Sequence, residues 1–594
     1  MNILLCTISF RSQKWIPFPV GCLISHCKKD SFINDNFTFL DPEFRSDCLE
    51  HKDFLKTLDG VDILGLTNYV WNQSYNDKIS IEFKKRNPKG IVVYGGPSVP
   101  ENEQIAEEYL NNRFYVDICF PGPGEEIFKN FLKNYFVDGI DNVVGAFTHD
   151  YNNSKVDRRS YNKIDLPTPY IDGVFNNIFQ KYSNLIASFE TNRGCPYSCA
   201  FCDWGGTARS KIHEFEDNSV KESLNHIFAE ESIDRIELVD ANFGMMRRDE
   251  SMLDHLIEIN KKRPKPMDMT FAGFAKNGSK SLLNIIEKID QNFVSQHKST
   301  TAKISFQSHH PEVLKTNLRD NIKNEKLDPM IKYYKENNVK VHAEMMLLPG
   351  ENAERFMHSL QKSSDLNINQ HRLYLTWVVP NTPMYSEEFR EKNKIKLKKI
   401  LIPHDIYHSN TTDVHNHRKG IPFKTKCDFS DPTDYQVIET FYECESFDSK
   451  ELTEIFDMWF WFSTFYNSNL LRYDIRKNYR KLSLQYKDYK NNLFRMPFIQ
   501  SLLDEYRECA YNTVIKPEPV TKITDIRYAA WLNKYLFRMG ELWEIYNNIE
   551  IVKDELIFLD KQLPFQYNYR KIKPIEDMNT LYYNYTRFEF DGME

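Results

Sequence analysis

Three closely spaced cysteines, Cys195, Cys199 and Cys202, are the residues best suited to chemistry in this chain of 594 residues. Thiolates separated by four and three residues can converge from one loop onto one iron–sulfur cluster. Three ligands leave one iron of a [4Fe–4S] cluster without a protein ligand, whereas an electron carrier is held by four cysteines. A substrate-activating cluster needs such an open iron, so the triplet predicts a catalytic [4Fe–4S] site.

Zinc is the alternative metal for the same triplet. A structural zinc site needs four ligands and usually has paired cysteines. The next cysteine downstream is Cys427, but His213 could supply a fourth ligand. Zinc therefore stays open on the sequence alone.

The triplet follows the first of six short apolar runs, each separated from the next by enough chain for a helix. Such a series predicts six βα units in a barrel or partial barrel, with the active site on the loops after the strands. The predicted strands are 185–189, 235–239, 267–271, 303–307, 339–346 and 372–379.

Motifs in this series resemble the radical S-adenosylmethionine (SAM) superfamily. The triplet has an aromatic residue, Phe201, before its last cysteine. Segment 304–319 (ISFQSHHPEVLKTNLR) resembles the fourth-strand segment of the superfamily, with His309 or His310 where asparagine is usual. LPGE at 348–351 and VPNTPM at 379–384 resemble the turns after the fifth and sixth strands.

The resemblance implies the chemistry. The open iron chelates SAM, and one electron from the cluster cleaves the C–S bond of SAM. An external donor of the flavodoxin or ferredoxin type supplies that electron. The resulting 5′-deoxyadenosyl radical abstracts a hydrogen atom from the substrate, while the protein positions the cofactor and excludes water and oxygen.

The same resemblance implies residues that line or anchor SAM, each with a structural alternative. The segment DANFG at 240–244 would also suit a capped strand-to-helix turn. Glu344 is as well suited to an ion pair inside the barrel as to a SAM contact. The predicted SAM-binding residues are Asp240, Asn242, Gln307, Ser308, Arg319 and Glu344.

Residues 1–150 alternate continuously apolar runs with amphipathic stretches. Strands that are buried on both faces have this pattern, so it predicts a parallel sheet covered by helices in a doubly wound α/β domain. Ligands of such domains bind beyond the carboxyl ends of the strands. The predicted strands are 2–8, 61–66, 91–94 and 116–120, and the predicted helices are 101–110 and 125–135.

Three polar or glycine-rich segments follow these strands. Glycines there let the backbone approach a ligand closely, although each segment alone also fits a plain turn. Their order resembles the cobalamin-binding domain that precedes many radical SAM modules, but the DxHxxG motif of some cobalamin proteins is absent. The resemblance implies cobalamin contacts from Asn68, Tyr69, Trp71, Gly95, Gly96, Pro97, Gly122, Gly124 and Glu125.

The predicted fold class is therefore α/β throughout most of the chain. We expect a Rossmann-like cobalamin domain at 1–150, a polar linker at 151–180, a radical SAM (β/α)6 partial barrel at 181–400 and a mainly helical C-terminal domain at 401–594. In the last domain, 459–462 fits a buried core better than a substrate platform. Cys427, Cys444 and Cys509 lack metal-binding spacing and are expected to be buried thiols.

Charge and composition narrow the class of protein. The net charge is −7 without a basic block, so no nucleic-acid footprint is visible. No run of 18 apolar residues could span a membrane, and the apolar start suits a first strand better than a signal peptide. The 11 cysteines are unevenly spread and do not suggest a disulfide framework. A cytoplasmic enzyme is expected.

The leading functional hypothesis is a cobalamin-dependent radical SAM methyltransferase. It would methylate an unactivated carbon of a small-molecule or natural-product-like substrate through the 5′-deoxyadenosyl radical and methylcobalamin. One alternative keeps both cofactors but catalyses cyclisation or another oxidative rearrangement without methyl transfer. Another is a cofactor-bearing binding protein without turnover. Motifs shared by these classes do not separate them.

Overall fold

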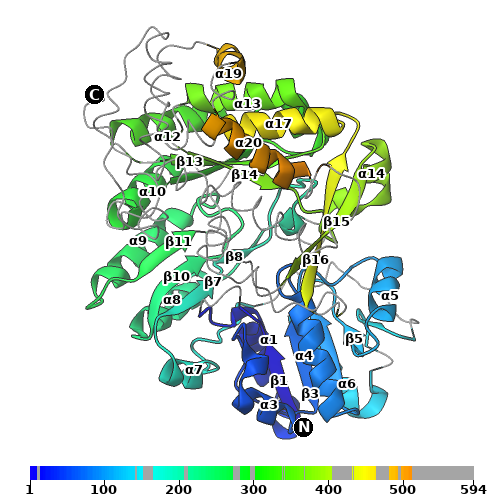
Figure 1. Cartoon of the computed structure of the whole chain (residues 1–594). Coiled ribbons are helices and arrows are strands. Elements are labelled where there is room, and N and C mark those ends of the chain that lie inside the picture. Colours follow the sequence, from blue (N-terminus) through cyan, green and yellow to red (C-terminus); the bar gives the residue numbers. More distant parts are fainter. Residues whose placement is uncertain are drawn as a thin grey trace.

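The computed structural model combines helices and parallel strands in three stacked regions (Figure 1). The amino-terminal sheet lies at the bottom of the view, the barrel strands lie above it, and the carboxyl-terminal helices lie at the top. The structure describes residues 1–9, 14–140, 143–150, 165–205, 212–271, 281–294, 302–337, 339, 341–366, 368, 370–403, 431, 434–462, 481–491, 497–511 and 515.

The amino-terminal sheet has six strands in the order β2-β1-β3-β4-β5-β6. The first five are parallel and β6 is antiparallel to β5, so the sheet has the order of a doubly wound flavodoxin-like domain. All four predicted strands form, although β2 and the antiparallel β6 were not predicted. The strands are β1 Asn2–Cys6, β2 Thr38–Phe39, β3 Ile63–Thr67, β4 Ile91–Gly95, β5 Ile118–Cys119 and β6 Phe147–Thr148.

Helices cover both faces of this sheet, as the continuously apolar strands predict. Helices α1 and α6 share one apolar core with one face, and α3, α4 and α5 share a second core with the other. The helices are α1 Phe18–Lys28, α2 Ser31–Asn36, α3 Lys52–Leu58, α4 Gln73–Arg86, α5 Glu103–Asn111 and α6 Glu125–Asp138.

The six predicted barrel strands are also present, each within a few residues of its predicted bounds. They form two parallel three-stranded sheets, in the orders β7-β10-β11 and β12-β13-β14. Helices follow the strands, so the arrangement is a (β/α)6 partial barrel. The strands are β7 Leu185–Phe189, β10 Ile233–Leu238, β11 Asp268–Phe271, β12 Ala302–Gln307, β13 Val341–Leu347 and β14 Gln370–Leu375. The helices are α8 Asp217–Ala229, α9 Asp249–Lys261, α10 Leu282–Ile289, α11 Pro311–Thr316, α12 Asn324–Glu336, α13 Ala353–Asp365 and α14 Glu387–Lys392.

The amino-terminal sheet and the barrel are joined by more than a linker. Ile186 forms two backbone hydrogen bonds of 2.9 Å to this segment, since its O accepts from Ile16 N and its N donates to Lys14 O. Residues 14–16 therefore pair with the edge of β7. Helix α1 then packs between the sheet and β7, with Phe18 6.1 Å from Phe189 between ring centroids. One apolar core therefore crosses the predicted domain boundary.

The predicted polar linker at 151–180 needs correction where it is described. Residues 151–164 lie outside the described residues, but 165–180 is packed into the shared core. Tyr170 and Phe175 are buried with ring centroids 5.1 Å apart, and α7 (Asn176–Lys181) follows them. The segment was predicted to be a linker because its polar residues and prolines are typical of loops, although Tyr170 and Phe175 are core residues.

The predicted start of a helical domain at 401 also needs correction. It falls inside β15 (Lys396–Pro403), which pairs antiparallel with β16 (Tyr435–Glu443). The described residues after β16 are mainly helical, in α17 (Ser449–Trp461), α19 (Leu482–Asn491) and α20 (Pro497–Ala510). Residues 404–430 and 516–594, and with them Cys427, lie outside the described residues.

Helix α17 packs onto the barrel instead of forming a separate core. Trp459 is fully buried and meets Phe356 of α13 with ring centroids 6.3 Å apart. The same apolar cluster contains Leu347 of β13 and Phe462. The prediction that 459–462 forms a core is therefore confirmed, and Cys444 is buried as expected.

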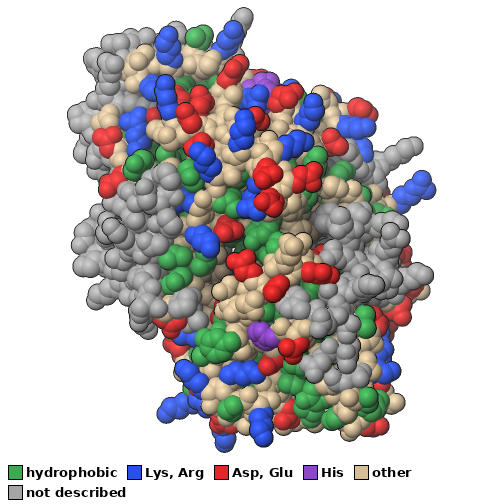
Figure 2. Space-filling model, turned by 90° about the vertical axis from the view of Figure 1, so that its right-hand side faces the viewer, with side chains coloured by type: hydrophobic (Ala, Val, Ile, Leu, Met, Phe, Trp, Pro, Cys, Tyr) green, Lys and Arg blue, Asp and Glu red, His purple; other side chains and the backbone are tan. Residues whose placement is uncertain are grey.

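Among the described residues, none of the helices is both long and apolar enough to cross a membrane. On the face shown in Figure 2, the coloured basic and acidic side chains are interspersed. This mixture agrees with the lack of a basic block in the sequence.

Because α17 shares the core of the barrel, we expect Trp459→Ala to lower the free energy of unfolding of the whole barrel by about 3–5 kcal/mol. Urea unfolding followed by circular dichroism and by limited proteolysis would measure this effect. Val437→Ala is the control, since Val437 is 40% exposed on β16. The shared core would be contradicted if, in Trp459→Ala, α17 were digested while the barrel still resisted proteolysis up to the urea concentration at which the wild-type barrel unfolds.

Candidate active site

The three cysteines lie on the loop after β7, at the carboxyl end of the barrel strands. Gly194 allows the loop to turn there. Its φ is +100°, a left-handed conformation that glycine adopts more readily than other residues. Cys195 and Cys199 are buried, Cys202 is half-buried, and none of the three forms a disulfide bond.

Asp240, which ends β10, anchors the start of this loop. Its Oδ1 accepts hydrogen bonds from Thr191 N and Thr191 Oγ1, each 3.0 Å, and from Asn192 N at 2.8 Å. Burial raises the pKa of Asp240 to about 7. The contacts are those of a capped strand end, the alternative that the sequence left open, while the buried Oδ2 has no described partner.

Two predicted residues contact the cysteine sulfurs. Asn242 Nδ2 donates to Cys195 Sγ at 3.1 Å, and Arg319 Nη1 lies 3.9 Å from Cys199 Sγ. Arg319 is fixed by the backbone oxygens of Ser305 and Phe306 at the end of β12. An amide donor and a guanidinium beside the sulfurs are outer contacts of the kind that orient metal ligands.

Other motifs converge on the same loop. Ala200 N donates to Asn317 O at 2.9 Å, and Met384 N donates to Ala200 O at 2.8 Å. Asn317 Nδ2 in turn donates to Pro349 O at 2.7 Å. The segments after the fourth, fifth and sixth barrel strands therefore hold the cysteine loop together, although they are far apart in sequence.

The remaining predicted SAM contacts differ in their surroundings. Gln307 has a φ of +66°, and its Oε1 is buried without a described hydrogen-bond partner, which leaves an acceptor for a ligand. Ser308 is occupied by Ser359, with the hydroxyl oxygens 3.1 Å apart. Glu344 pairs with Lys303 at 3.0 Å, the ion-pair alternative.

The described residues provide no group of three His, Cys, Asp or Glu side chains arranged around a single metal ion. A mononuclear zinc ion would need such a group. In a [4Fe–4S] cluster each thiolate binds a different iron, so the sulfurs need not converge on one point. The loop is therefore better suited to a cluster than to zinc, and His213 lies on β9 (His213–Glu214), paired with Arg193 of β8 (Asn192–Arg193).

The amino-terminal loops lie at the carboxyl edge of the six-stranded sheet. Asn68 N donates to Gly95 O at 2.7 Å, which ties the loop after β3 to the loop after β4. Asn68 is fully buried, and its Oδ1 accepts from Asn76 Nδ2 at 3.0 Å. Its side chain holds the loop, which is a structural use of a residue predicted to contact cobalamin.

Gly96 and two aromatic residues shape this edge. Gly96 has a φ of +95°, and a Cβ there would lie 2.8 Å from Asn68 O, so only glycine permits this approach of the two loops. Tyr69 and Trp71 are half-buried and stacked, with ring centroids 4.3 Å apart and planes 9° apart. The stack is an apolar platform of the kind that organic cofactors use.

An ion pair joins the third loop to the cysteine loop. Glu125 follows Gly122, Pro123 and Gly124 and begins α6, and its Oε1 lies 2.8 Å from Arg193 Nη1. Arg193 also pairs with Glu190. Burial raises the pKa of Glu125, but the Arg193 cation lowers it further, so the net pKa is below its usual range.

A second contact joins the loop after β14 to the loop after β4. Asn381 Nδ2 donates to Pro97 O at 3.0 Å and to Val99 O at 2.8 Å, and Asn381 Oδ1 accepts from Glu101 N at 2.7 Å. Neither Arg193 nor Asn381 was a predicted site residue. The charge directly before Gly194 and Cys195 was the one available signal for Arg193.

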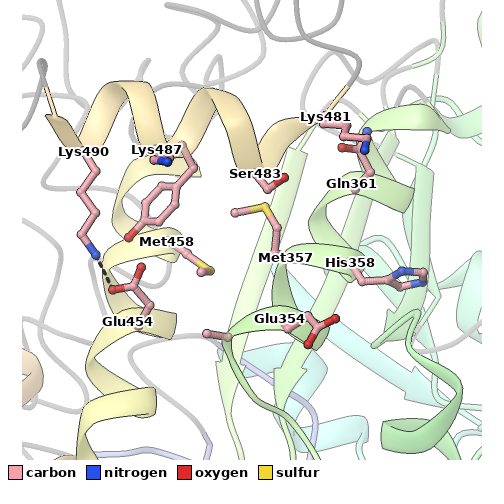
Figure 3. Close-up of a pocket in the computed structure, with 12 residues that line it drawn as sticks. Glu354, Met357, His358, Gln361, Glu454, Met458, Lys481, Ser483, Lys487 and Lys490 are labelled. Atoms are coloured by element: carbon pink, nitrogen blue, oxygen red, sulfur yellow. Dashed lines mark hydrogen bonds and ion pairs between the residues drawn. The ribbon is translucent and has the colours of Figure 1, made fainter.

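A cavity of about 580 Å³ lies elsewhere, between α13, α17 and α19. Figure 3 shows Lys490 pairing with Glu454 at one side, with Met357 and Met458 between the helices. None of the predicted cofactor-binding residues lines it. The candidate site is therefore the set of loops at the strand ends and not this cavity.

Comparison with known proteins agrees with this geometry. Residues 189–362 match the radical SAM superfamily. The chain is 28% identical over 397 residues to the cobalamin-dependent radical SAM methyltransferase TokK of Streptomyces tokunonensis. It is 28% identical over 394 residues to the 2-(S-pantetheinyl)-carbapenam-3-carboxylate methyltransferase of Streptantibioticus cattleyicolor. Both alignments cover 64% of this chain but only 56% of the relative.

The fold is similar to that of the cobalamin-dependent S-adenosylmethionine radical enzyme OxsB, solved with aqua-cobalamin and SAM bound. The TM-score is 0.50 at 13% identity, and the match covers 98% of this chain and 83% of OxsB. The predicted α/β fold class, with a Rossmann-like sheet in front of a partial barrel, is thereby confirmed.

Glu351 of the LPGE turn makes a contribution to folding stability that depends on pH. It is 1% exposed, its Oε2 accepts from Ser308 Oγ at 3.4 Å, and burial raises its pKa to about 8. Because the folded pKa is above the unfolded value, folding favours the neutral acid. The stabilising contribution is complete below the unfolded pKa and is lost as the pH rises toward 8.

We therefore expect Glu351→Gln to be more stable than wild type at high pH, since the amide cannot ionise. The difference should grow by roughly 2–4 kcal/mol between about pH 5 and about pH 8.5. Urea unfolding at both pH values measures it, with Glu354→Gln at an exposed position of α13 as the control. A constant difference between the two proteins at all pH values would contradict a buried neutral acid.

Proposed function

We propose that this chain, whose residues 189–362 are a radical SAM domain, is a cobalamin-dependent radical SAM methyltransferase. Its substrate would be a small, natural-product-like molecule with an unactivated carbon. The two curated relatives are named as methyltransferases, and one name states cobalamin dependence. Since the alignment spans about half of their length, activity and substrate are proposals for this chain.

The observation that carries the proposal is the joining of two sets of strand-end loops. The cysteine loop of the barrel contacts the glycine turn before α6, and the loop after β14 contacts the loop after β4. Both sets lie at the carboxyl ends of parallel strands, where cofactors of α/β folds bind. A methyl transfer that uses two cofactors needs two such sites close together.

We assign the cluster to Cys195, Cys199 and Cys202. When bound, the cluster and SAM supply the 5′-deoxyadenosyl radical, and cobalamin supplies the methyl group. Asn242 and Arg319 contact two of the sulfurs and would orient them toward the cluster. The free Oε1 of Gln307 offers a hydrogen-bond acceptor to the SAM amino group.

We assign cobalamin to the amino-terminal edge. The Tyr69 and Trp71 rings would contact the corrin, and Gly96 would leave room for its close approach. The sheet at 1–150 would thus serve cobalamin and the barrel at 181–400 would serve the cluster and SAM. The part after 400 would complete the barrel wall, since Val378 N donates to Glu439 O of β16 at 2.9 Å.

The proposed chemistry also needs an external electron donor, for which we expect a flavodoxin or ferredoxin. A reduced cluster and thiolate ligands require a reducing compartment, so we place the reaction in the cytoplasm. The nine described cysteines that are free thiols are consistent with that placement.

Replacing the three cysteines tests the cluster assignment. We expect the variant with Cys195, Cys199 and Cys202 all changed to Ala to lose the absorbance near about 400 nm and the roughly four irons per chain of a cluster, because no thiolate remains. Cobalamin content should be retained, since that site is on the other sheet. Cys444→Ala is the matched control, because it removes a buried cysteine outside the loop. Unchanged iron in the triple variant would refute the assignment.

Product analysis tests the reaction itself. Reconstituted protein with SAM, hydroxocobalamin and a low-potential reductant should release both 5′-deoxyadenosine and S-adenosylhomocysteine when supplied with candidate substrates or an extract. Mass spectrometry identifies both products, and the triple cysteine variant is the blank. 5′-Deoxyadenosine with a product of altered skeleton and without S-adenosylhomocysteine would instead support the oxidative rearrangement. The absence of both products would refute radical SAM chemistry.

A further inference from the structure

The ion pair between Glu125 and Arg193 joins the two sets of loops, but the proposed function gives neither side chain a role of its own. Glu125 was predicted to contact cobalamin, but its Oε1 lies 2.8 Å from Arg193 Nη1. Its side chain is 5% exposed. Because the Glu125 carboxylate is buried, loss of its arginine partner would leave an uncompensated charge in the interior.

Arg193 is tied to the barrel on its other side. Its Nε donates to Glu190 Oε1 at 3.1 Å, and its backbone belongs to the short β8–β9 pair. The planar guanidinium can serve two carboxylates with a defined geometry, which the ammonium group of lysine cannot do. Arg193 is therefore a rigid link between the glycine turn at 122–124 and the loop that carries Cys195.

Asn381 provides an independent link at the other side of the interface. All three of its described side-chain hydrogen bonds go to backbone groups of the 97–101 loop. Its φ of +67° is one that asparagine tolerates better than most residues. Two loops of the barrel are thus fixed to two loops of the amino-terminal domain by partly buried polar contacts.

We propose that Glu125 is not a cofactor ligand but, with Arg193, a positioning pair that fixes the cluster loop relative to the cobalamin-binding edge. The inference rests on the proposed function, because the proposed function assigns the two loops to two different cofactors. Its physical basis is that a reaction shared by two bound groups is sensitive to displacements of about 1 Å, which can cost on the order of 100-fold in rate.

Backbone hydrogen exchange tests the link without any substrate. We expect Glu125→Gln to raise amide exchange in a peptide covering 192–202 by about fivefold or more, although the mutation lies in the other domain. Arg193→Lys should raise exchange at 119–128 in return, since coupling is reciprocal. The double variant should show no more than the larger single effect. Arg235→Gln, which removes the Arg235–Asp268 pair within the barrel, should leave both peptides unchanged.

Pulsed electron paramagnetic resonance gives the second readout. In the protein with cob(II)alamin and a reduced cluster, the dipolar coupling between the two spins reports their separation. We expect Glu125→Gln to bind both cofactors in wild-type amounts. The distribution of dipolar couplings, and so of distances between the two spins, should become broader. Asn381→Asp, which removes the two donated hydrogen bonds and keeps the tolerance of positive φ, should act in the same direction.

Two results would overturn the inference. One is unchanged exchange at 192–202 together with an unchanged spin coupling in Glu125→Gln. The other is loss of cobalamin from Glu125→Gln with wild-type exchange at 192–202, because Glu125 would then be a cofactor contact. Wild-type protein that binds no cobalamin would instead refute the proposed function, and hydrogen exchange would still decide whether the link exists. If the Arg193 variant does not fold, Glu125→Gln and Asn381→Asp decide the question.

Discussion

The packing of α1 between two parallel sheets is the constraint on which the rest of the structure depends. Its apolar residues join the core of the amino-terminal sheet to that of β7, while 14–16 pairs with the β7 edge. Burial of this shared surface is non-directional and supplies most of the favourable free energy. The relative orientation of the two sheets is set by polar contacts at the strand ends, where Arg193 and Asn381 fix which loops meet.

The same division of labour is visible in the cysteine loop. Loops contain few apolar groups, so their positions depend on hydrogen bonds to neighbours. Asp240 holds the first turn, Asn317 and Met384 hold the middle, and Asn242 and Arg319 approach the sulfurs. These contacts come from the segments that follow three barrel strands, β10, β12 and β14, so the loop is ordered only when the barrel is assembled.

The carboxyl-terminal part has a comparable dependence on the barrel. β16 is linked to the segment after β14 by the hydrogen bond from Val378 N to Glu439 O. Its Gln436 Oε1 accepts from Ser74 N of α4 at 3.1 Å. Trp459 and Phe462 complete the core beside α13. This part contacts both the barrel and the amino-terminal domain, which explains why its boundary is not marked by a break in packing.

The sequence by itself determined the long parallel strands, the barrel class and the spacing of the three cysteines on one loop. Periodicity of apolar residues and the spacing of thiols are local properties, so they are readable without a fold. It also indicated a close backbone approach at Gly96. The backbone conformation at this position requires glycine. Tertiary structure alone decided that Glu125 faces Arg193, that Glu344 pairs with Lys303 and that Tyr170 and Phe175 are buried. These outcomes depend on which segments meet in space although they are far apart in the chain, and no local pattern records that pairing.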